Sequence, residues 1–246
     1  VSEYLCSSNI PRKLSFTGSV PVGKHLQKLA AENMIRCTME LGGHSPLMVF
    51  NDTDIEKAAQ ISVAGKFRNA GQVCVSPTRF LVQDDIKDKF TQAVIEETNK
   101  IKVGNGLEDD TNMGPLIAER RIDVMNDFVK DAIDNGANIE MGGNRMNRVG
   151  SFFSPTVMTG VDDSSKIMNE EPFGPLLPID TFKSVDEVID RANRLDFGLA
   201  SYAFTNDPKI VDNLRSEIQA GLLAVNSTVV STPETPFGGI KHSGYG

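Results

Sequence analysis

At 246 residues with 39% hydrophobic residues, the chain is long enough to bury a sizeable core in one or two domains. A formal net charge of -8 disfavours sequence-independent binding to nucleic acid, which requires a basic surface. No apolar run has the length that spans a bilayer and no signal-peptide pattern is found, so we expect a cytoplasmic protein with no membrane partner.

The cysteines are an odd number at irregular spacing, Cys6, Cys37 and Cys74, and none belongs to a CxxC or Cys/His cluster. The three histidines are spread along the chain without metal-ligand spacing. We therefore expect no disulfide framework and no metal site, and a reducing compartment is favoured.

In chain order, the first predicted element is a short strand at 13–16, followed by a glycine turn and a helix that begins near Pro21. A second strand at 36–41 runs into Gly42-Gly43, and Asn51-Asp52-Thr53 can cap the next helix. Further strands are expected at 46–50, 78–83, 155–158, 176–182, 200–205 and 222–226, and further helices at 54–68, 86–101, 119–135, 185–192 and 208–218. This alternation predicts an α/β fold with a largely parallel sheet flanked by helices, which ends in a glycine-rich loop at 236–246.

Cys74 follows the point where a predicted helix stops, at Asn69-Ala70-Gly71, and precedes the strand at 78–83. Functional residues are often placed at such junctions. Backbone N–H groups aimed at the sulfur are expected to lower the pKa of the thiol and to stabilise an oxyanion formed beside it. Upstream, Glu40 in Met39-Glu40-Leu41-Gly42-Gly43 is a candidate acid/base partner.

Taken alone, a cysteine is more often an inert buried thiol, but this one occurs together with other motifs. They are Phe16-Thr17-Gly18-Ser19 with Gly23, Glu40-Leu41-Gly42-Gly43, Gly71-Gln72-Val73-Cys74, Glu171-Pro172-Phe173-Gly174-Pro175 and Pro236-Phe237-Gly238-Gly239. In this order and context, the chain resembles the aldehyde dehydrogenase superfamily over essentially its whole length.

The resemblance implies two parts. Residues 42–246 correspond to a catalytic domain, and residues 1–41 to the C-terminal remnant of a Rossmann-like dinucleotide-binding domain. Family members continue beyond both ends of the matching region, so we expect the chain to be a fragment that is incomplete for catalysis alone. For the complete protein, the resemblance implies a homodimer or homotetramer.

The same resemblance assigns catalytic roles to two residues. Cys74 as a thiolate attacks the aldehyde carbon, and expulsion of hydride to NAD or NADP leaves a thioester. Glu40 takes a proton from the water that hydrolyses this thioester to a carboxylic acid, a step that suits a base with a raised pKa.

Cofactor-binding roles are implied for six positions. Gly18 and Ser19 match the turn at the pyrophosphate, where a following helix N-terminus favours phosphate. Glu171 matches the carboxylate that binds the nicotinamide ribose, and Phe173 matches the aromatic residue near the nicotinamide. Leu41 and Gly42 belong to the same cofactor-binding set. The choice between NAD and NADP stays open.

Among aldehyde dehydrogenases, the sequences around Cys74 and at 233–239 look most like members that act on succinate semialdehyde or 2-oxoglutarate semialdehyde. A guanidinium can bind such a carboxylate bidentately, and Arg68 is the local candidate. An alternative for Arg68 is a solvated helix-end cation.

Three other functions are compatible with parts of this sequence. A CoA-acylating aldehyde dehydrogenase would resolve the thioester with a thiol, and Glu40 argues against it because water needs the base more. A catalytically silent fragment would act only as a folding or association unit. A Cys/His hydrolase is disfavoured because His25 and His44 lie outside any hydrolase motif.

Overall fold

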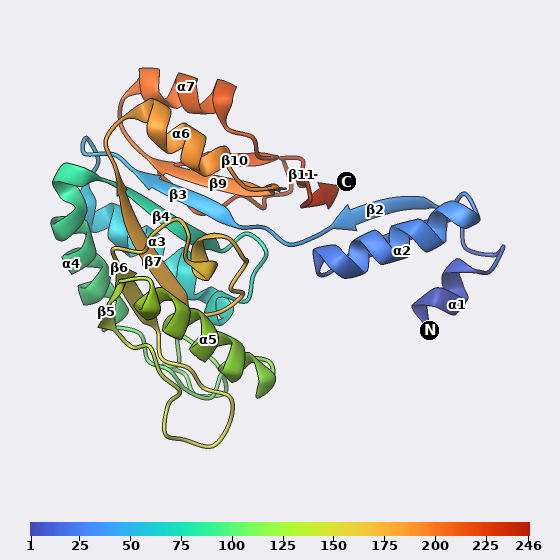
Figure 1. Ribbon diagram of the computed structural model, residues 1–246, viewed down its shortest axis with the longest axis horizontal. Helices are drawn as coiled ribbons and strands as arrows, with labels where there is room; N and C mark the ends of the chain where they lie inside the picture. Colours follow the sequence, from blue (N-terminus) through green and yellow to red (C-terminus); the bar gives the residue numbers. More distant parts are fainter.

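The computed structural model describes residues 1–246 and contains a seven-stranded sheet, a three-stranded sheet and a two-stranded ribbon (Figure 1). The large sheet has the order β10-β9-β3-β4-β7-β6-β5, and all neighbours are parallel except β5 and β6. Its strands are β3 (Ser45–Val49), β4 (Pro77–Gln83), β5 (Asn138–Met141), β6 (Thr156–Thr159), β7 (Leu176–Phe182), β9 (Ala200–Phe204) and β10 (Leu222–Val225). The predicted α/β fold with a largely parallel sheet is therefore confirmed.

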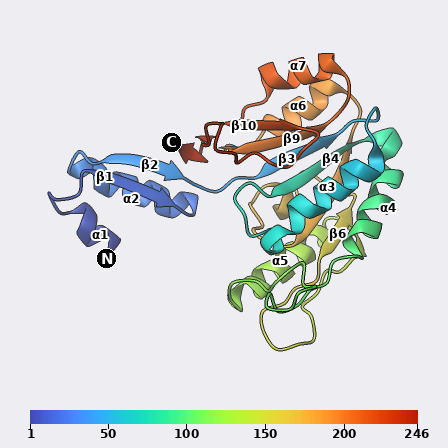
Figure 2. The ribbon, with the colours of Figure 1, turned by 180° about the vertical axis from the view of Figure 1, so that it is seen from behind.

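Helices cover both faces of this sheet, with α3 and α4 side by side on one face and α6 and α7 on the other (Figures 1 and 2). The helices of this lobe are α3 (Ile55–Phe67), α4 (Lys87–Thr98), α5 (Arg120–Asp134), α6 (Val185–Asn193) and α7 (Pro208–Glu217). Asp54 caps α3 by accepting a 3.0 Å hydrogen bond from the N–H of Lys57. The cap is thus one residue after the segment that the sequence suggested. None of the helices is long and apolar enough to cross a membrane.

The core lies between the large sheet and its helices and contains 41 buried hydrophobic residues. Every residue of β3, β6 and β9 is buried, as expected for parallel strands that are covered on both faces. Because these strands are buried, they hold the loops that follow their carboxyl ends in fixed positions.

A smaller lobe is formed by β1 (Lys13–Thr17), β2 (Arg36–Glu40) and α2 (Val20–Glu32), which project away from the large sheet (Figure 1). The strands β1 and β2 are parallel, and the last strand, β12 (Gly244–Tyr245), pairs antiparallel with β2. The boundary between residues 41 and 42 stays a prediction, and the chain crosses there from one sheet to the other.

Five short elements were not expected from the sequence. The helix α1 (Ser2–Cys6) precedes the small lobe, and the edge strand β5 follows α5. The glycine-rich end folds into β11 (Ile240–Lys241), which pairs with β8 (Phe197–Gly198), and then into β12. Strands of two residues carry too little periodicity to be recognised in a sequence.

Candidate active site

Cys74 lies in a turn between α3 and β4, where the backbone takes an uncommon path. Three successive residues have positive φ angles, Asn69 at 51°, Ala70 at 54° and Gly71 at 70°. This region is rarely occupied by residues other than glycine, and such departures cluster at functional sites. A Cβ at Gly71 would overlap the carbonyl oxygen of Gly174, so the loop packs directly against the segment that contains Glu171.

Gln72 holds this loop in place. Its side-chain amide donates to the carbonyl oxygens of Asn69 and Pro115, and its Oε1 accepts a 2.9 Å hydrogen bond from the N–H of Ile117. The residue before Val73 and Cys74 is thereby fixed to a second loop. Sequence reasoning gave Gln72 no role beyond its place in the motif.

Glu171 and the Gly42-Gly43 segment are in direct contact. The N–H of Gly43 donates a 3.2 Å hydrogen bond to Oε1 of Glu171, and a Cβ at Gly42 would overlap Oε2. A Cβ at Gly43 would lie 2.8 Å from the carbonyl oxygen of Cys74. Gly42, Cys74 and Glu171 are thus close together, although they are far apart in the sequence.

Two cations flank Glu171. Lys66, on the last turn of α3, is fully buried, and its Nζ has no hydrogen-bond partner. Arg121 donates to the carbonyl oxygens of Pro172 and Phe173. Burial raises the pKa of Glu171 to about 7 against the opposing effects of the Gly43 N–H, Lys66 and Arg121. Burial likewise lowers the pKa of Lys66 to about 7.

The pKa of Cys74 differs from the expected direction. Burial, followed by the charge of Glu171, raises the pKa of the thiol, and Glu40 adds to the increase. The backbone N–H groups of Cys74 and Val75 do act in the expected sense and lower it. The expectation of a lowered pKa is therefore wrong for this structure, because desolvation and two carboxylates outweigh two backbone donors.

Glu40 is the last residue of β2, where it is held between β1 and β12. Its backbone carbonyl accepts a 3.1 Å hydrogen bond from the N–H of Gly18. Its side-chain Oε2 is buried without a hydrogen-bond partner, and burial raises the pKa of the carboxyl group. A raised pKa makes this carboxylate a stronger proton acceptor than an exposed glutamate.

The other cofactor positions divide between the two lobes. Gly18 and Ser19 are exposed at the N-terminus of α2, where no side chain caps the helix. Leu41 is buried against Gly23 of α2. Phe173 lies beside Glu171 with a φ of 44° and is 36% exposed. The uncapped N–H groups and the partly exposed ring are available to a ligand, which fits the dinucleotide implied by the resemblance.

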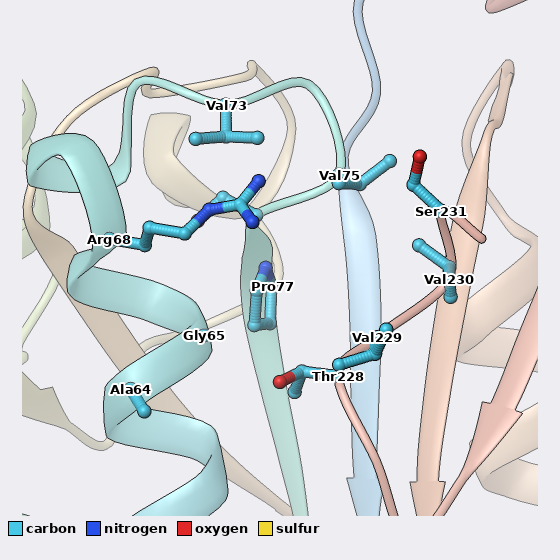
Figure 3. Close-up of a pocket in the computed structure, with 11 residues that line it drawn as sticks. Ala64, Gly65, Arg68, Val73, Val75, Pro77, Thr228, Val229, Val230 and Ser231 are labelled. Atoms are coloured by element: carbon cyan, nitrogen blue, oxygen red, sulfur yellow. The ribbon is translucent and has the colours of Figure 1, made fainter. Parts of the chain in front are cut away.

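Arg68 lines a pocket of about 220 Å³ beside the Cys74 turn (Figure 3). The walls come from the end of α3, from the residues on both sides of Cys74 and from segment 228–231. Arg68 is the only charged residue among those that line it, and its side chain extends into the pocket with Ser231 on the opposite wall (Figure 3). The pocket therefore offers one cation and small polar groups to a ligand.

The sequence analysis did not identify four residues near the site: Lys66, Arg121, Tyr202 and Ser231. Of these, Lys66 could have been recognised from the sequence pattern, because it lies on the same face of α3 as the buried Ala59, Ser62 and Val63. A lysine at a buried position of a helix is unusual and merits attention.

The comparisons with known proteins agree with these observations. The model of the aldehyde dehydrogenase family matches residues 1–246. The chain is 39% identical over its whole length to the NADP(+) succinate-semialdehyde dehydrogenase of Escherichia coli, of which it covers 51%. It is 40% identical over its whole length to the 3-sulfolactaldehyde dehydrogenase of Pseudomonas putida, again covering 51%.

A solved structure of a succinate-semialdehyde dehydrogenase from Burkholderia pseudomallei has a TM-score of 0.98 to this chain at 38% sequence identity. The match covers 100% of this chain and 51% of that one. The chain thus spans about half the length of the proteins that it matches. Since the family model matches the chain from its first residue to its last, the chain belongs to the aldehyde dehydrogenase family.

Proposed function

We propose that the complete protein oxidises an aldehyde to a carboxylic acid with NAD or NADP, and that Cys74 is its nucleophile. The observation that carries this proposal is the convergence of Cys74, Glu40 and Glu171, in which both carboxylates influence the thiol. Both carboxyl groups have a raised pKa. A thiol beside such groups can act as a nucleophile, and a carboxylate can then assist hydrolysis at the same place.

In the proposed reaction, the Cys74 thiolate adds to the aldehyde carbon and forms a thiohemiacetal. The N–H of Cys74 stabilises the resulting oxyanion. Loss of hydride from this carbon leaves a thioester on Cys74. Glu40 then removes a proton from water, which attacks the thioester and releases the acid and the thiol.

For the cofactor, the chain offers groups of suitable chemistry. The nicotinamide, when bound, supplies the hydride acceptor. Glu171 would bind the hydroxyls of its ribose, and Phe173 would pack beside the ring. The N–H groups that follow Gly18 and Ser19 have no side-chain cap and would bind the pyrophosphate. NAD and NADP are both compatible with these residues.

For the substrate, we propose an aldehyde that carries an acidic group. Arg68 is the lone charged residue of the pocket beside Cys74, and a guanidinium suits carboxylate or sulfonate oxygens. Ser231 on the opposite wall can donate a further hydrogen bond. The named substrates of the two curated relatives, succinate semialdehyde and 3-sulfolactaldehyde, are both anionic aldehydes.

The test measures reduction of NAD and NADP by the complete protein with succinate semialdehyde, 3-sulfolactaldehyde and uncharged butanal. Cys74→Ala is expected to lower the rate at least about 10³-fold with every substrate. Arg68→Met is expected to raise KM about 10- to 100-fold for the anionic aldehydes and to leave butanal unaffected. Product release as free acid without CoA separates this activity from the CoA-acylating alternative.

Two outcomes would contradict the proposal. An unchanged rate in Cys74→Ala would show that another residue is the nucleophile. An equal KM increase for butanal and succinate semialdehyde in Arg68→Met would show that the guanidinium does not bind the acidic group. The homodimer or homotetramer stays a prediction for the complete protein.

A further inference from the structure

Tyr202 is a fully buried tyrosine in the middle of β9, and the reaction described above gives it no role. Its hydroxyl donates a 2.5 Å hydrogen bond to the backbone carbonyl of Val75, the residue that follows Cys74. Buried tyrosines combine a rigid apolar ring with a polar tip that needs a partner. Here the partner is the peptide next to the sulfur-bearing residue.

Cys74 and Val75 are the two central residues of a turn. The turn is closed by a 2.9 Å hydrogen bond from the N–H of Ser76 to the carbonyl oxygen of Val73. The Val75 carbonyl and the Ser76 N–H belong to one planar peptide. Tyr202 and Val73 therefore hold this peptide from opposite sides.

The rest of the turn is fixed by backbone groups and a small side chain. The Cys74 carbonyl packs closely against Gly43, and the hydroxyl of Ser76 donates a 3.3 Å hydrogen bond to the carbonyl of Lys66. With these contacts in place, the N–H groups of Cys74 and Val75 act on the sulfur. Tyr202 is the long side chain that contacts this turn through a single oxygen atom. Removal of that hydroxyl would abolish the hydrogen bond to Val75.

We propose that Tyr202 is a positioning residue whose hydroxyl orients the turn 73–76, so that the N–H groups of Cys74 and Val75 face the sulfur and the oxyanion formed beside it. The proposal rests on the assignment of Cys74 as the nucleophile. Burial raises the pKa of Tyr202, Cys74 raises it further and Arg68 opposes the increase. The hydroxyl is therefore protonated and donates throughout the neutral range.

The experiment uses Tyr202→Phe in the complete protein, because phenylalanine preserves the ring and removes only the hydroxyl. Alkylation of each cysteine by iodoacetamide is followed from pH 6 to pH 10 by peptide mass spectrometry. At pH 7 we expect Cys74 to react roughly three- to tenfold more slowly, with the midpoint of its pH profile moved upward. The charged groups that face the sulfur, Glu40 and Glu171, are retained.

The same variant is expected to lower kcat for aldehyde oxidation by a similar factor and to leave dinucleotide affinity unchanged. Tyr4→Phe is the matched control, since Tyr4 is 78% exposed in α1, outside the sheets that carry Cys74 and Glu40. It should react and turn over like the unmodified protein. Thermal unfolding of both variants measures any general loss of stability.

Two results would overturn the role of Tyr202. One is an unchanged alkylation profile and kcat in Tyr202→Phe. The other is a slower reaction with an unshifted midpoint and a reduced Tm, which indicates general loosening rather than orientation of the turn. Failure of the nucleophile assignment is distinct: Cys74 of the unmodified protein would then react no faster than Cys6 and Cys37.

Discussion

The two sheets of this molecule differ in how completely they are covered. In the seven-stranded sheet, β3 and β9 are buried along their whole length, β4 is buried except at Gln83, and helices lie on both faces. In the three-stranded sheet, β1 alternates between exposed and partly buried residues, and its neighbour β2 buries Met39 alone. Large apolar side chains are also exposed in the small lobe, at Met34, and in the segment that precedes it, at Tyr4 and Ile10.

The proposed nucleophile and its base lie on different sheets. Cys74 stands on the sheet that has a complete core of its own, whereas Glu40 ends a strand of the incompletely covered sheet. Large apolar side chains left exposed in this way are candidates for contact with another part of the protein. The geometry of the thiol is therefore set within this chain, while the position of the base depends on how the small lobe is held.

Between the two sheets, the largest expected effect concerns Glu40. Replacement by glutamine removes the base at the junction of the lobes and should slow steady-state acid release by about 10²- to 10³-fold, since general-base catalysis contributes this much. One equivalent of reduced nicotinamide should still form in a rapid burst, because hydride transfer precedes hydrolysis. Stopped-flow absorbance at the reduced-nicotinamide band measures both phases.

Glu32→Gln, at the exposed end of α2 in the same lobe, is the matched control and should behave like the unmodified protein. Loss of the burst together with the steady-state rate would contradict the assignment, because it would make Glu40 necessary for attack by the thiol as well.

The next effect compares one substitution in the two sheets. Leu47 in β3 is fully buried, whereas Leu14 in β1 is only partly buried. Leu47→Ala should reduce the free energy of unfolding by about 2–5 kcal/mol, the usual range for a buried leucine. Leu14→Ala should reduce it by about 1 kcal/mol, because less apolar surface is lost. Urea unfolding of the 246-residue chain, followed by circular dichroism, provides the measurement.

Equal reductions in the free energy of unfolding for the two variants would show that the two sheets do not differ in how well they bury their side chains. If Leu14→Ala reduced the free energy of unfolding more in the complete protein than in the 246-residue chain, the difference between the sheets would be explained. The larger reduction would show that β1 is covered in the complete protein.

The smallest effect is a pH dependence at Glu171, which contacts the segment between the lobes. Its pKa is raised to about 7, so the carboxyl group is protonated and neutral below this pH and ionised above it. Dinucleotide affinity should therefore decline about tenfold between pH 8 and pH 6, as the acceptor for the ribose hydroxyls is lost. Isothermal titration with NAD and NADP measures this decline, and Glu171→Gln should abolish it.

Lys66→Met should move the midpoint of this decline to higher pH, because a nearby cation that favours the carboxylate is removed. Arg121, the other cation that acts on Glu171, is kept, and Lys57→Met on the exposed face of α3 serves as the control. The same midpoint in Glu171→Gln and the unmodified protein would show that a different group titrates.

Much of this arrangement could be predicted from the sequence. Alternation of strands and helices indicated the large sheet, because short apolar runs bounded by turn residues, such as Leu222–Val225, are typical of buried strands. Cys74, Glu40 and Glu171 were recognised because each belongs to a short motif with glycine or proline beside it. Their roles remain predictions, while their proximity is a feature of the fold.

The remainder depended on packing between distant segments. The hydrogen bond from Tyr202 to Val75 joins residues 127 positions apart, and no local sequence pattern predicts it. The direction of the Cys74 pKa shift followed from burial and from two carboxylates on other segments, and a sequence does not give the balance of such opposing effects. The pairing of β12 with β2 was missed for the same reason.

The pairing of Gly244 with Glu40 also has a consequence for biosynthesis. The strand that carries the proposed base leaves the ribosome about 200 residues before the strand that completes its sheet. At roughly 5–20 residues per second, this interval lasts on the order of 10–40 s. During that time β2 has an open edge, and a nascent chain in this state is expected to depend on chaperones or on early partners for protection from aggregation.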